Sequence, residues 1–316
     1  MSTTVFNYNG GKLSTGGIDL QSLAEKYGTP LYVYNNDHII DNYNSFMNAF
    51  DGKCVAHFAM KSNSNQAILT GLAKAGCGMD IVSGGELQRA IKAGVSPDKI
   101  IFSGVAKSDS ELADALNAGI LQINVESVEE IHQLNDVAKE LGKVAPVALR
   151  VNPNVDAGTH DKISTGKKTD KFGIDIELAP ELYKQMNAMD NINPVSISVH
   201  IGSQLMSAEP FVESYKKVAE LAETLIASGT QLKRLDLGGG LGICYEKSDT
   251  PPDVNEYAKM VNDTVGHLNL DLHFEPGRWL VGNAGALIGR VENVKSNDVK
   301  TFVLGDVAMN DLVRPT

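Results

Sequence analysis

Short apolar runs rich in β-branched residues recur along this 316-residue chain, and helical patterns such as SGGELQRAIKAG separate the first of them. Such runs are typical of parallel strands that are buried on both faces. Eight of them occur, at 55–60, 78–83, 100–104, 121–126, 146–152, 195–202, 234–240 and 272–277. Eight β/α units within about 250 residues predict an α/β fold of the (β/α)8 TIM-barrel type. A doubly wound open sheet is the alternative.

Both ends of the chain depart from this pattern. Residues 1–34 contain the strand-like TPLYVY with no helical partner, and after residue 282 two strands are joined by the polar turn KSND. We therefore expect the barrel to occupy 35–281 and a second, all-β domain to form from 1–34 and 282–316. The chain stops at MNDLVRPT, soon after a strand, so we expect this second domain to be incomplete.

The composition excludes several classes of function. The formal net charge of −11 argues against binding to nucleic acid, which favours a basic patch. No apolar run approaches the length of a membrane span, and MSTTVFNYNGG lacks the features of a signal peptide. Three scattered cysteines suit the reducing cytoplasm, and the cysteines and histidines show no metal-ligand spacing. We predict a cytoplasmic protein without a metal site.

Polar, charged and glycine residues gather at the carboxyl ends of the expected strands, where the catalytic residues of TIM barrels lie. They are Lys61, Asp80, Ser83, Arg150, Asn152, His200, Ser203, Gly238, Gly239, Gly240, Glu275, Gly277 and Arg278. Chance would rarely place a lysine, a histidine, a glutamate, two arginines and three successive glycines on one rim. The set therefore indicates an active site.

Each of these residues also has a structural interpretation. Lys61 could turn out to water where its strand ends, because lysine is seldom buried without a partner. Asp80 could cap the helix that begins near Gly84. His200 could be a hydrogen-bonded core histidine, and Glu275 could be an ion-pair partner of Arg278.

Two glycine-bearing segments are equally open to interpretation. GGGLG, after the seventh strand, could be a tight turn into a helix, or a nest of backbone N–H groups that holds a phosphate at a helix N-terminus. Phosphate sites in TIM barrels favour the loops after strands seven and eight. The polar segment 156–173 could be a solvated loop or a lid over the barrel mouth.

Pyridoxal phosphate is one cofactor that accounts for the whole set. It needs a lysine for a Schiff base, N–H groups for its phosphate and a partner for its ring nitrogen. Lys61, the glycines and Glu275 supply these, and His200 supplies a flat surface for the ring. A carboxylate partner keeps the nitrogen protonated. Raising its pKa by two units takes about 2.7 kcal/mol, and an ion pair at 4 Å near a protein surface supplies about 4 kcal/mol.

At these positions the sequence resembles the fold-type III pyridoxal-phosphate decarboxylases, and within them the diaminopimelate decarboxylase family. The matching motifs follow one another in order over nearly the whole chain: FAMKSN, GMDIVSGGEL, STGKKTDKFG, HIGSQ, GGGLG, EPGR and MNDLVRP. HIGSQ and MNDLVRP favour diaminopimelate over ornithine or arginine as the substrate.

The resemblance implies a role for each residue. Lys61 would bind the cofactor aldehyde, His200 would stack on the ring and Glu275 would hold the ring nitrogen. Asp80 and Arg150 would lie around the ring and Lys61. Gly239, Gly240, Gly277 and Ser203 would hold the phosphate. Arg278 would contribute to the cofactor site and, together with Arg314, bind the distal end of the substrate. The reaction would convert meso-diaminopimelate to L-lysine and CO2 in a homodimer.

The resemblance also implies that family members continue beyond this chain. They carry an aromatic-containing segment, then a Cys-Glu-Ser motif that is given to the partner's active site, then a further tyrosine. We therefore expect a truncated member of the family. Two rival functions stay open at this point, namely a pyridoxal-phosphate carrier without turnover and a Schiff-base aldolase acting on a phosphosugar.

Overall fold

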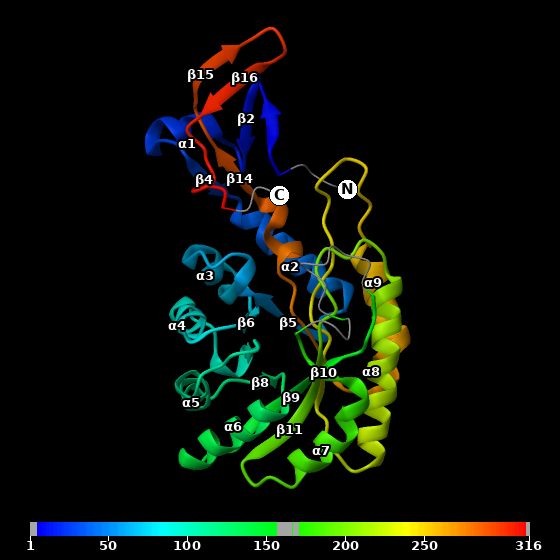
Figure 1. The fold of residues 1–316 in the computed structure, drawn as a ribbon. Coiled ribbons are helices and arrows are strands. Elements are labelled where there is room, and N and C mark those ends of the chain that lie inside the picture. Colours follow the sequence, from blue (N-terminus) through cyan, green and yellow to red (C-terminus); the bar gives the residue numbers. More distant parts are fainter. Residues whose placement is uncertain (1–4, 157–165, 167–170, 314–316) are drawn as a thin grey trace. The chain divides into compact units, whose positions relative to one another are not determined.

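The computed structural model describes residues 5–156, 166 and 171–313, and it divides into two compact units. One unit comprises residues 40–281, and the other combines residues 1–39 with residues 282–316. Figure 1 shows the helices and strands of both units, coloured along the sequence, and the two units are described separately.

Unit 40–281 is built around a closed barrel of parallel strands (Figure 1). Its strands are β5 (Cys54–Ala59), β6 (Gly78–Ile81), β7 (Ile100–Phe102), β8 (Gln122–Val125), β9 (Ala145–Asn152), β11 (Ile192–Val199), β12 (Arg234–Asp236) and β13 (Asp271–Phe274). Short β10 (Ile174–Asp175) adds to the end of β9. Pairing of β13 with β5 and of β8 with β9 closes the ring. The predicted TIM barrel is therefore confirmed, and the open sheet is wrong.

Helices and short 3-10 turns connect these strands. The helices are α2 (Asn36–Ala49), in which the division between the units falls, α3 (Gln66–Lys74), α4 (Gly84–Ala93), α5 (Asp109–Ala118), α6 (Val128–Glu140), α7 (Ala179–Asn187), α8 (Glu209–Ala227), α9 (Val254–Val265) and α10 (Arg278–Val281). The 3-10 turns are η1 (Met60–Ser62), η2 (Pro97–Lys99), η4 (Ile176–Leu178) and η5 (Gly266–Leu268). None of the helices in the described ranges is both long and apolar enough to cross a membrane.

A repeated serine cap explains where three successive helices begin. Ser83, Ser108 and Ser127 each accept a hydrogen bond from the backbone N–H three residues later, at the first turn of α4, α5 and α6. A serine oxygen in this place satisfies one of the N–H groups that a helix start leaves unpaired. Each cap lies between a strand and the helix that follows it, and it fixes where that helix begins.

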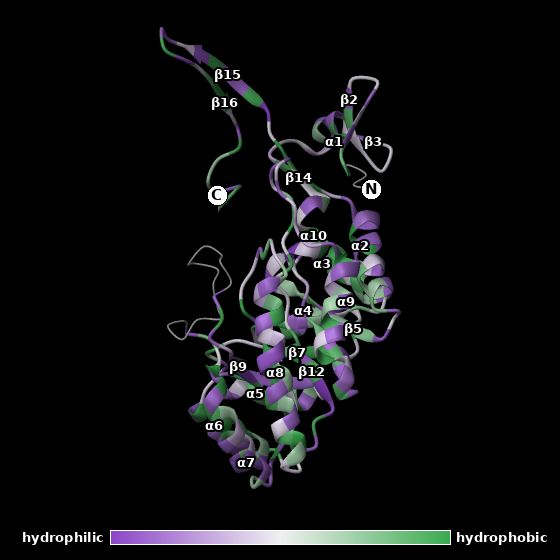
Figure 2. Cartoon of the chain, turned by 90° about the vertical axis from the view of Figure 1, so that its right-hand side faces the viewer, coloured by the Kyte–Doolittle hydropathy of each residue, from purple (hydrophilic) through white to green (hydrophobic). Residues whose placement is uncertain are grey.

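The hydrophobic core lies between the barrel wall and the surrounding helices, whose two-sided colouring is visible in Figure 2. An aromatic cluster fills part of this layer. Phe274 of β13 packs against Phe50 at a centroid distance of 4.7 Å and against Phe46 of α2 at 5.5 Å. Tyr257 of α9 packs edge-on against Phe211 of α8 at 5.2 Å. This layer fixes the helices around the barrel.

The interior of the barrel is polar. Buried polar side chains alternate with apolar ones along β8, where Gln122 and Asn124 alternate with Ile123 and Val125. Because successive side chains of a strand point to opposite faces, the polar ones share a face. Asn124 reaches Ser198 of β11 and Asp236 of β12, so that face is the barrel interior.

The unit formed by the two chain ends contains three small antiparallel sheets. Its elements are β1 (Asn7–Asn9), β2 (Lys12–Thr15), β3 (Ile18–Asp19), α1 (Leu20–Tyr27), β4 (Leu31–Tyr34), η6 (Gly282–Ala284), β14 (Gly285–Ile288), β15 (Val291–Ser296) and β16 (Thr301–Gly305). TPLYVY contains β4, which pairs with β14, and KSND joins β15 to β16. Helix α1, capped by Asp19, was not anticipated.

Candidate active site

Lys61 lies directly after β5, in the single turn η1, with half of its side chain accessible. Its Nζ is 2.8 Å from Oδ2 of Asp80, which is fully buried at the end of the neighbouring strand β6. Burial lowers the pKa of Lys61, but the carboxylates of Asp80 and Glu275 raise it by more, so the net pKa is raised. The lysine therefore does not simply turn out to water: it is held at the barrel mouth as a cation.

Asp80 keeps one oxygen free at this mouth. Its Oδ2 accepts from Lys61, whereas its buried Oδ1 has no hydrogen-bond partner among the described residues. The helix that follows, α4, is capped by Ser83, so the alternative that Asp80 is the cap is wrong. An unpaired buried carboxylate oxygen is costly. Its presence beside Lys61 indicates a place for a polar ligand atom.

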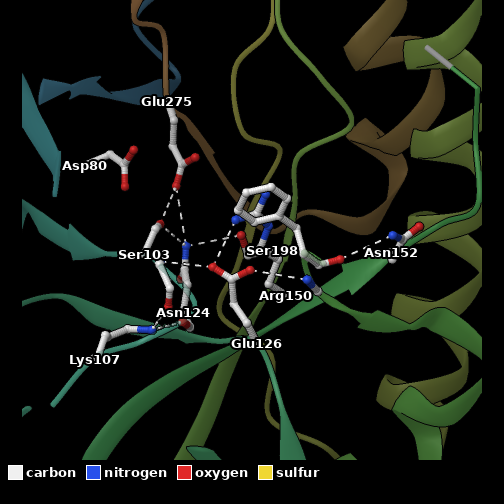
Figure 3. A network of polar contacts seen from close by, with 12 residues as sticks. Asp80, Ser103, Lys107, Asn124, Glu126, Arg150, Asn152, Ser198 and Glu275 are labelled. Carbon is white, nitrogen blue, oxygen red and sulfur yellow. Dashed lines mark hydrogen bonds and ion pairs between the residues drawn. The ribbon is translucent and has the colours of Figure 1, made fainter. Parts of the chain in front are cut away.

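Glu275 follows β13 and is buried with 6% of its surface exposed. Among the described residues, its Oε1 has two long contacts, to the hydroxyl of Ser103 and to Nδ2 of Asn124, both at 3.4 Å. Burial and the neighbouring carboxylates of Asp236 and Asp80 raise its pKa well above the usual range. Figure 3 shows this carboxyl group reaching down toward Ser103 and Asn124.

The alternative role for Glu275, an ion pair with Arg278, is not found among the described residues. Nη1 of Arg278 instead donates a hydrogen bond to the hydroxyl oxygen of Tyr245 at 2.9 Å. Its guanidinium also lies 5.7 Å from the centre of the Tyr245 ring.

Arg150, near the end of β9, is held by a buried carboxylate (Figure 3). Its Nη1 donates to Oε1 of Glu126 at 3.0 Å. The two oxygens of Glu126 also accept from the backbone N–H groups of Gly104, at 3.0 Å, and Gly173, at 3.2 Å. The guanidinium lies 5.0 Å from the centre of the Phe172 ring. One glutamate thus fixes an arginine and two loops around the mouth.

His200 follows β11 and lies beside the glycine-rich turn after β12. Its Nδ1 accepts from the backbone N–H of Gly239 at 3.2 Å. Burial, and then the positive charges of Arg150 and Lys61, lower the pKa of His200 well below its usual value. The imidazole is therefore neutral near pH 7. Ser203 lies three residues further along the same segment.

The three glycines after β12 are required by close backbone approach. A Cβ at Gly239 would lie 2.2 Å from the carbonyl oxygen of Glu275, and one at Gly240 would lie 2.7 Å from that of Gly202. Gly238 and Gly240 also have positive φ, 67° and 117°. No helix begins directly after them, since the next helix, α9, starts at Val254. The expectation of a strand-to-helix turn, or of a helix N-terminus here, is therefore wrong.

Gly277 completes this rim. A Cβ there would lie 3.1 Å from Cβ of Ala59 and 3.3 Å from Oγ of Ser62, so it packs against the turn that carries Lys61. Among the described residues, the backbone N–H groups of Gly240 and Gly277 donate to no protein acceptor. Arg314 and most of the segment 156–173 lie outside the described residues, so neither the second substrate arginine nor the lid can be located.

Sequence reasoning missed three interior side chains that organise this site. Asn124 and Asp236 lie on β8 and β12 beneath Glu275, and Glu126 follows β8 and holds Arg150. A signal was present in the sequence. Polar residues at alternate positions of the strands QINV and RLD point to a polar face inside the barrel.

Two kinds of comparison place this chain among known proteins. The family model "Pyridoxal-dependent decarboxylase, pyridoxal binding domain" matches residues 36–282. Diaminopimelate decarboxylase of Pseudomonas fluorescens is 46% identical over 312 residues, which cover 98% of this chain and 75% of that protein. The enzyme of the same name from Neisseria meningitidis serogroup A is 48% identical over 294 residues, covering 93% and 72%.

Solved structures agree with these sequence matches. Diaminopimelate decarboxylase of M. jannaschii in complex with L-lysine matches with a TM-score of 0.93 and 41% identity, covering 98% of this chain and 75% of that one. The Helicobacter pylori enzyme, also complexed with L-lysine, matches with a TM-score of 0.91 and 41% identity, covering 94% and 75%. This chain therefore belongs to the diaminopimelate decarboxylase family of pyridoxal-dependent decarboxylases.

Proposed function

We propose that this protein uses pyridoxal 5'-phosphate to decarboxylate meso-2,6-diaminopimelate to L-lysine and CO2. The observation that carries the proposal is the pairing of an accessible Lys61 with Asp80 in the mouth of a barrel that also contains Glu275. The second oxygen of Asp80 has no hydrogen-bond partner in the part of the chain that the structure describes. Relatives at 46–48% identity bear the name of this activity, and two structural relatives are complexes with L-lysine.

The residues present fit the cofactor. Lys61 supplies an amine at an accessible position, and the unpaired Oδ1 of Asp80 supplies an acceptor beside it. The backbone N–H groups of Gly240 and Gly277, which donate to no acceptor in the described ranges, are donors of the kind that hold phosphate. We propose that Gly239 and Ser203 complete the phosphate site, that His200 covers the ring and that Arg150 and Arg278 line the pocket.

Glu275 fits the place of the ring-nitrogen partner. When bound, pyridoxal phosphate supplies a conjugated ring that accepts the electron pair left behind by departing CO2. Glu275 can keep the ring nitrogen protonated, because its own raised pKa means that it carries a proton to share. An arginine at this position would oppose that protonation. A carboxyl group as the partner of the ring nitrogen therefore favours a decarboxylase over a racemase.

The surrounding groups control the other protons. Asp80 holds Lys61 in its charged form, so this carboxylate is the nearest acceptor for the proton that the amine must lose before it can act as a nucleophile. Neutral His200 can cover the ring without placing a second positive charge against it. Arg278, braced by Tyr245, is proposed to bind the distal carboxylate of the substrate together with Arg314.

The test is release of CO2 from meso-diaminopimelate by the protein loaded with pyridoxal phosphate, with ornithine, arginine and L-lysine as comparison substrates. We expect turnover of diaminopimelate and little of the others. A visible absorption band without turnover of any amino acid would favour the carrier. Absence of the band together with cleavage of a phosphosugar would favour the aldolase. Faster release from ornithine or arginine would move the specificity to those substrates.

We also propose that the protein forms a homodimer in the cytoplasm, as the resemblance implies. Sedimentation of the cofactor-loaded protein tests the first point, since a dimer would sediment at twice the mass of the chain. Cell fractionation tests the second.

A further inference from the structure

Two buried carboxyl groups lie close together beneath the mouth of the barrel, on adjacent strands. Asp236 ends β12 with no exposed surface, and Glu275 follows β13 with 6% exposed. One side-chain amide connects them, because Nδ2 of Asn124 is 3.0 Å from Oδ2 of Asp236 and 3.4 Å from Oε1 of Glu275. No described cation forms an ion pair with either group. Two adjacent carboxylates in such a place cannot readily both be ionised.

The hydrogen-bond donors are distributed unequally between the two groups. Asp236 accepts from Asn124 at 3.0 Å, from Nε2 of Gln122 at 3.3 Å and, on its other oxygen, from the backbone N–H of Gly238 at 3.2 Å. Among the described residues, the hydrogen bonds that Glu275 accepts are the two contacts of 3.4 Å from Asn124 and Ser103, and a side-chain hydrogen bond with Glu275 acts to lower the pKa of Asp236. Donors stabilise the ionised form of a carboxyl group. The negative charge therefore belongs on Asp236 and the proton on Glu275.

We propose that Asp236 and Glu275 hold one proton between them, and that Asp236 is the positioning residue that keeps this proton on Glu275 for the ring nitrogen of the cofactor. The role assigned to the proton rests on the proposed function, whereas the pair itself does not. On cofactor binding, the proton would pass from the Glu275 carboxyl to the neutral ring nitrogen. It would leave a pyridinium against a carboxylate, with no net uptake of protons.

The other charged groups around the pair are consistent with one shared proton. Asp80, on β6, raises the pKa of both carboxyl groups, whereas Lys61 and Arg150 lower that of Glu275. Arg234 lies on the same strand as Asp236 and also interacts with it electrostatically. Two histidines on β5 and β13, His57 and His273, are neutral at physiological pH because burial lowers their pKa to about 4 and about 2.

The experiment uses the cofactor-free protein, labelled with ¹³C at the glutamate side-chain carboxyl, and follows the Glu275 resonance by NMR as the pH is varied. Glu275→Gln assigns the resonance. We expect Glu275 in the parent to stay protonated at pH 7, and in Asp236→Asn to lose its proton at least tenfold more readily, a shift of one pH unit or more. An unchanged titration in Asp236→Asn would overturn the proposal, since burial alone would then account for the protonation.

Two further measurements separate the pair from a merely structural role. Asp271→Asn removes an exposed carboxylate from β13 with the same change of charge, and should leave the Glu275 titration where it is. With ¹³C-labelled aspartate, Asp236 should in turn ionise more readily in Glu275→Gln than in the parent. Absence of this reciprocal shift would contradict a shared proton.

The loaded enzyme supplies the last readout. If the proton serves the cofactor, Asp236→Asn should move the alkaline limb of the kcat profile to lower pH by the same shift as the NMR titration, because activity is lost where the proton is lost. If the titrations show a shared proton but the protein does not bind pyridoxal phosphate, the proposal of a shared proton holds and the proposed function is refuted. A parent-like kcat profile despite a shifted titration would refute the role of Asp236 in the reaction.

Discussion

Lys61 and Lys107 each pair with a carboxylate of the barrel unit, but their surroundings differ. The Lys107 side chain is 1% exposed, and its Nζ donates to the carbonyl oxygens of Gly104 and Asn124, at 2.6 and 2.8 Å, and to Glu130. Its three hydrogens thus have three acceptors. Lys61 is half accessible. Within the described part of the chain its one acceptor is Asp80, whose other oxygen has no hydrogen-bond partner there.

This difference separates a structural lysine from one that is available for chemistry. A buried ion pair whose hydrogen bonds are complete has no capacity for a ligand, and it stabilises the fold only while both partners remain. An accessible lysine beside an unpaired carboxylate oxygen keeps donors and an acceptor for a new partner. Hence the same residue type, on neighbouring segments of one barrel, is expected to serve structure in one place and catalysis in the other.

The strongest challenge to this comparison is Lys61→Ala. We expect CO2 release to fall by roughly 10⁴-fold, which corresponds to about 5.5 kcal/mol of transition-state stabilisation. The free energy of unfolding should fall by less than about 2 kcal/mol, because water can reach Asp80 once the accessible side chain is removed. Borohydride reduction of the loaded parent, followed by peptide mapping, should place the pyridoxyl group on Lys61. An adduct on Lys107 or Lys171 would invert the comparison.

The converse change is Lys107→Met. Removing this amine leaves Glu130 buried without its cation, so the free energy of unfolding should fall by about 3–5 kcal/mol. Urea unfolding measures the loss, with Lys92→Met on the exposed face of α4 as the control. Any Lys107→Met protein that remains folded should still form the borohydride adduct at Lys61. A loss no larger than that of the control would mean that the closed network is not structural.

A second closed pair lies inside the barrel and predicts a pH effect. Nε2 of His57 is 2.8 Å from Nδ1 of His273, and burial lowers the two pKa values to about 4 and about 2. Below pH 6.5 the unfolded chain binds protons at these residues while the folded chain does not, so stability falls as the pH falls toward 4. The loss is roughly 3 kcal/mol for His57 alone.

Urea unfolding at several pH values tests this expectation, together with NMR of the imidazole protons. The decline between pH 7 and pH 4 should be smaller in His273→Gln, which removes one of the two groups. Titration of the His57 imidazole between pH 6 and pH 7 in the folded protein would show that the pair takes up protons readily. The pair would then not be a closed structural pair that differs from Lys61.

The smallest expected effect concerns the helix after Asp80. Ser83→Ala removes the cap of α4 and should cost about 1 kcal/mol of stability, while cofactor binding stays unchanged. Thermal unfolding and cofactor titration measure the two effects, with Ser108→Ala at the start of α5 as a matched change. Weaker cofactor binding in Ser83→Ala alone would mean that the cap also positions Asp80.

Much of the fold could be predicted from the sequence because the strands are short, continuous apolar runs at regular spacing. The residues that follow them, such as Lys61 and Glu275, were then placed at the correct end of the barrel by topology alone. The turn after Gly240 was not predictable in this way. Glycine permits either a helix start or an open loop, and the close approach of Glu275 and Gly202 to these glycines is a long-range contact.

The polar interior shows the same limit. The alternation of Gln122 and Asn124 with apolar residues is visible in the sequence, but their partners Ser198 and Asp236 come from strands far along the chain. No local pattern predicts that Asn124 donates at 3.0 Å to Asp236 and only at 3.4 Å to Glu275.

The sequence by itself determined the kind of fold, the set of strand-end residues and the cofactor class that this set suits, because periodicity and residue chemistry are local properties. Only the tertiary structure decided that Asp80 keeps an unpaired oxygen beside Lys61, that Lys107 is fully satisfied and that Glu126 holds Arg150. These outcomes depend on burial and on distances between segments that the barrel brings together. Burial and these distances set the pKa of a polar group and decide which of its hydrogen bonds are made. Neither can be read from the residues next to it in the sequence.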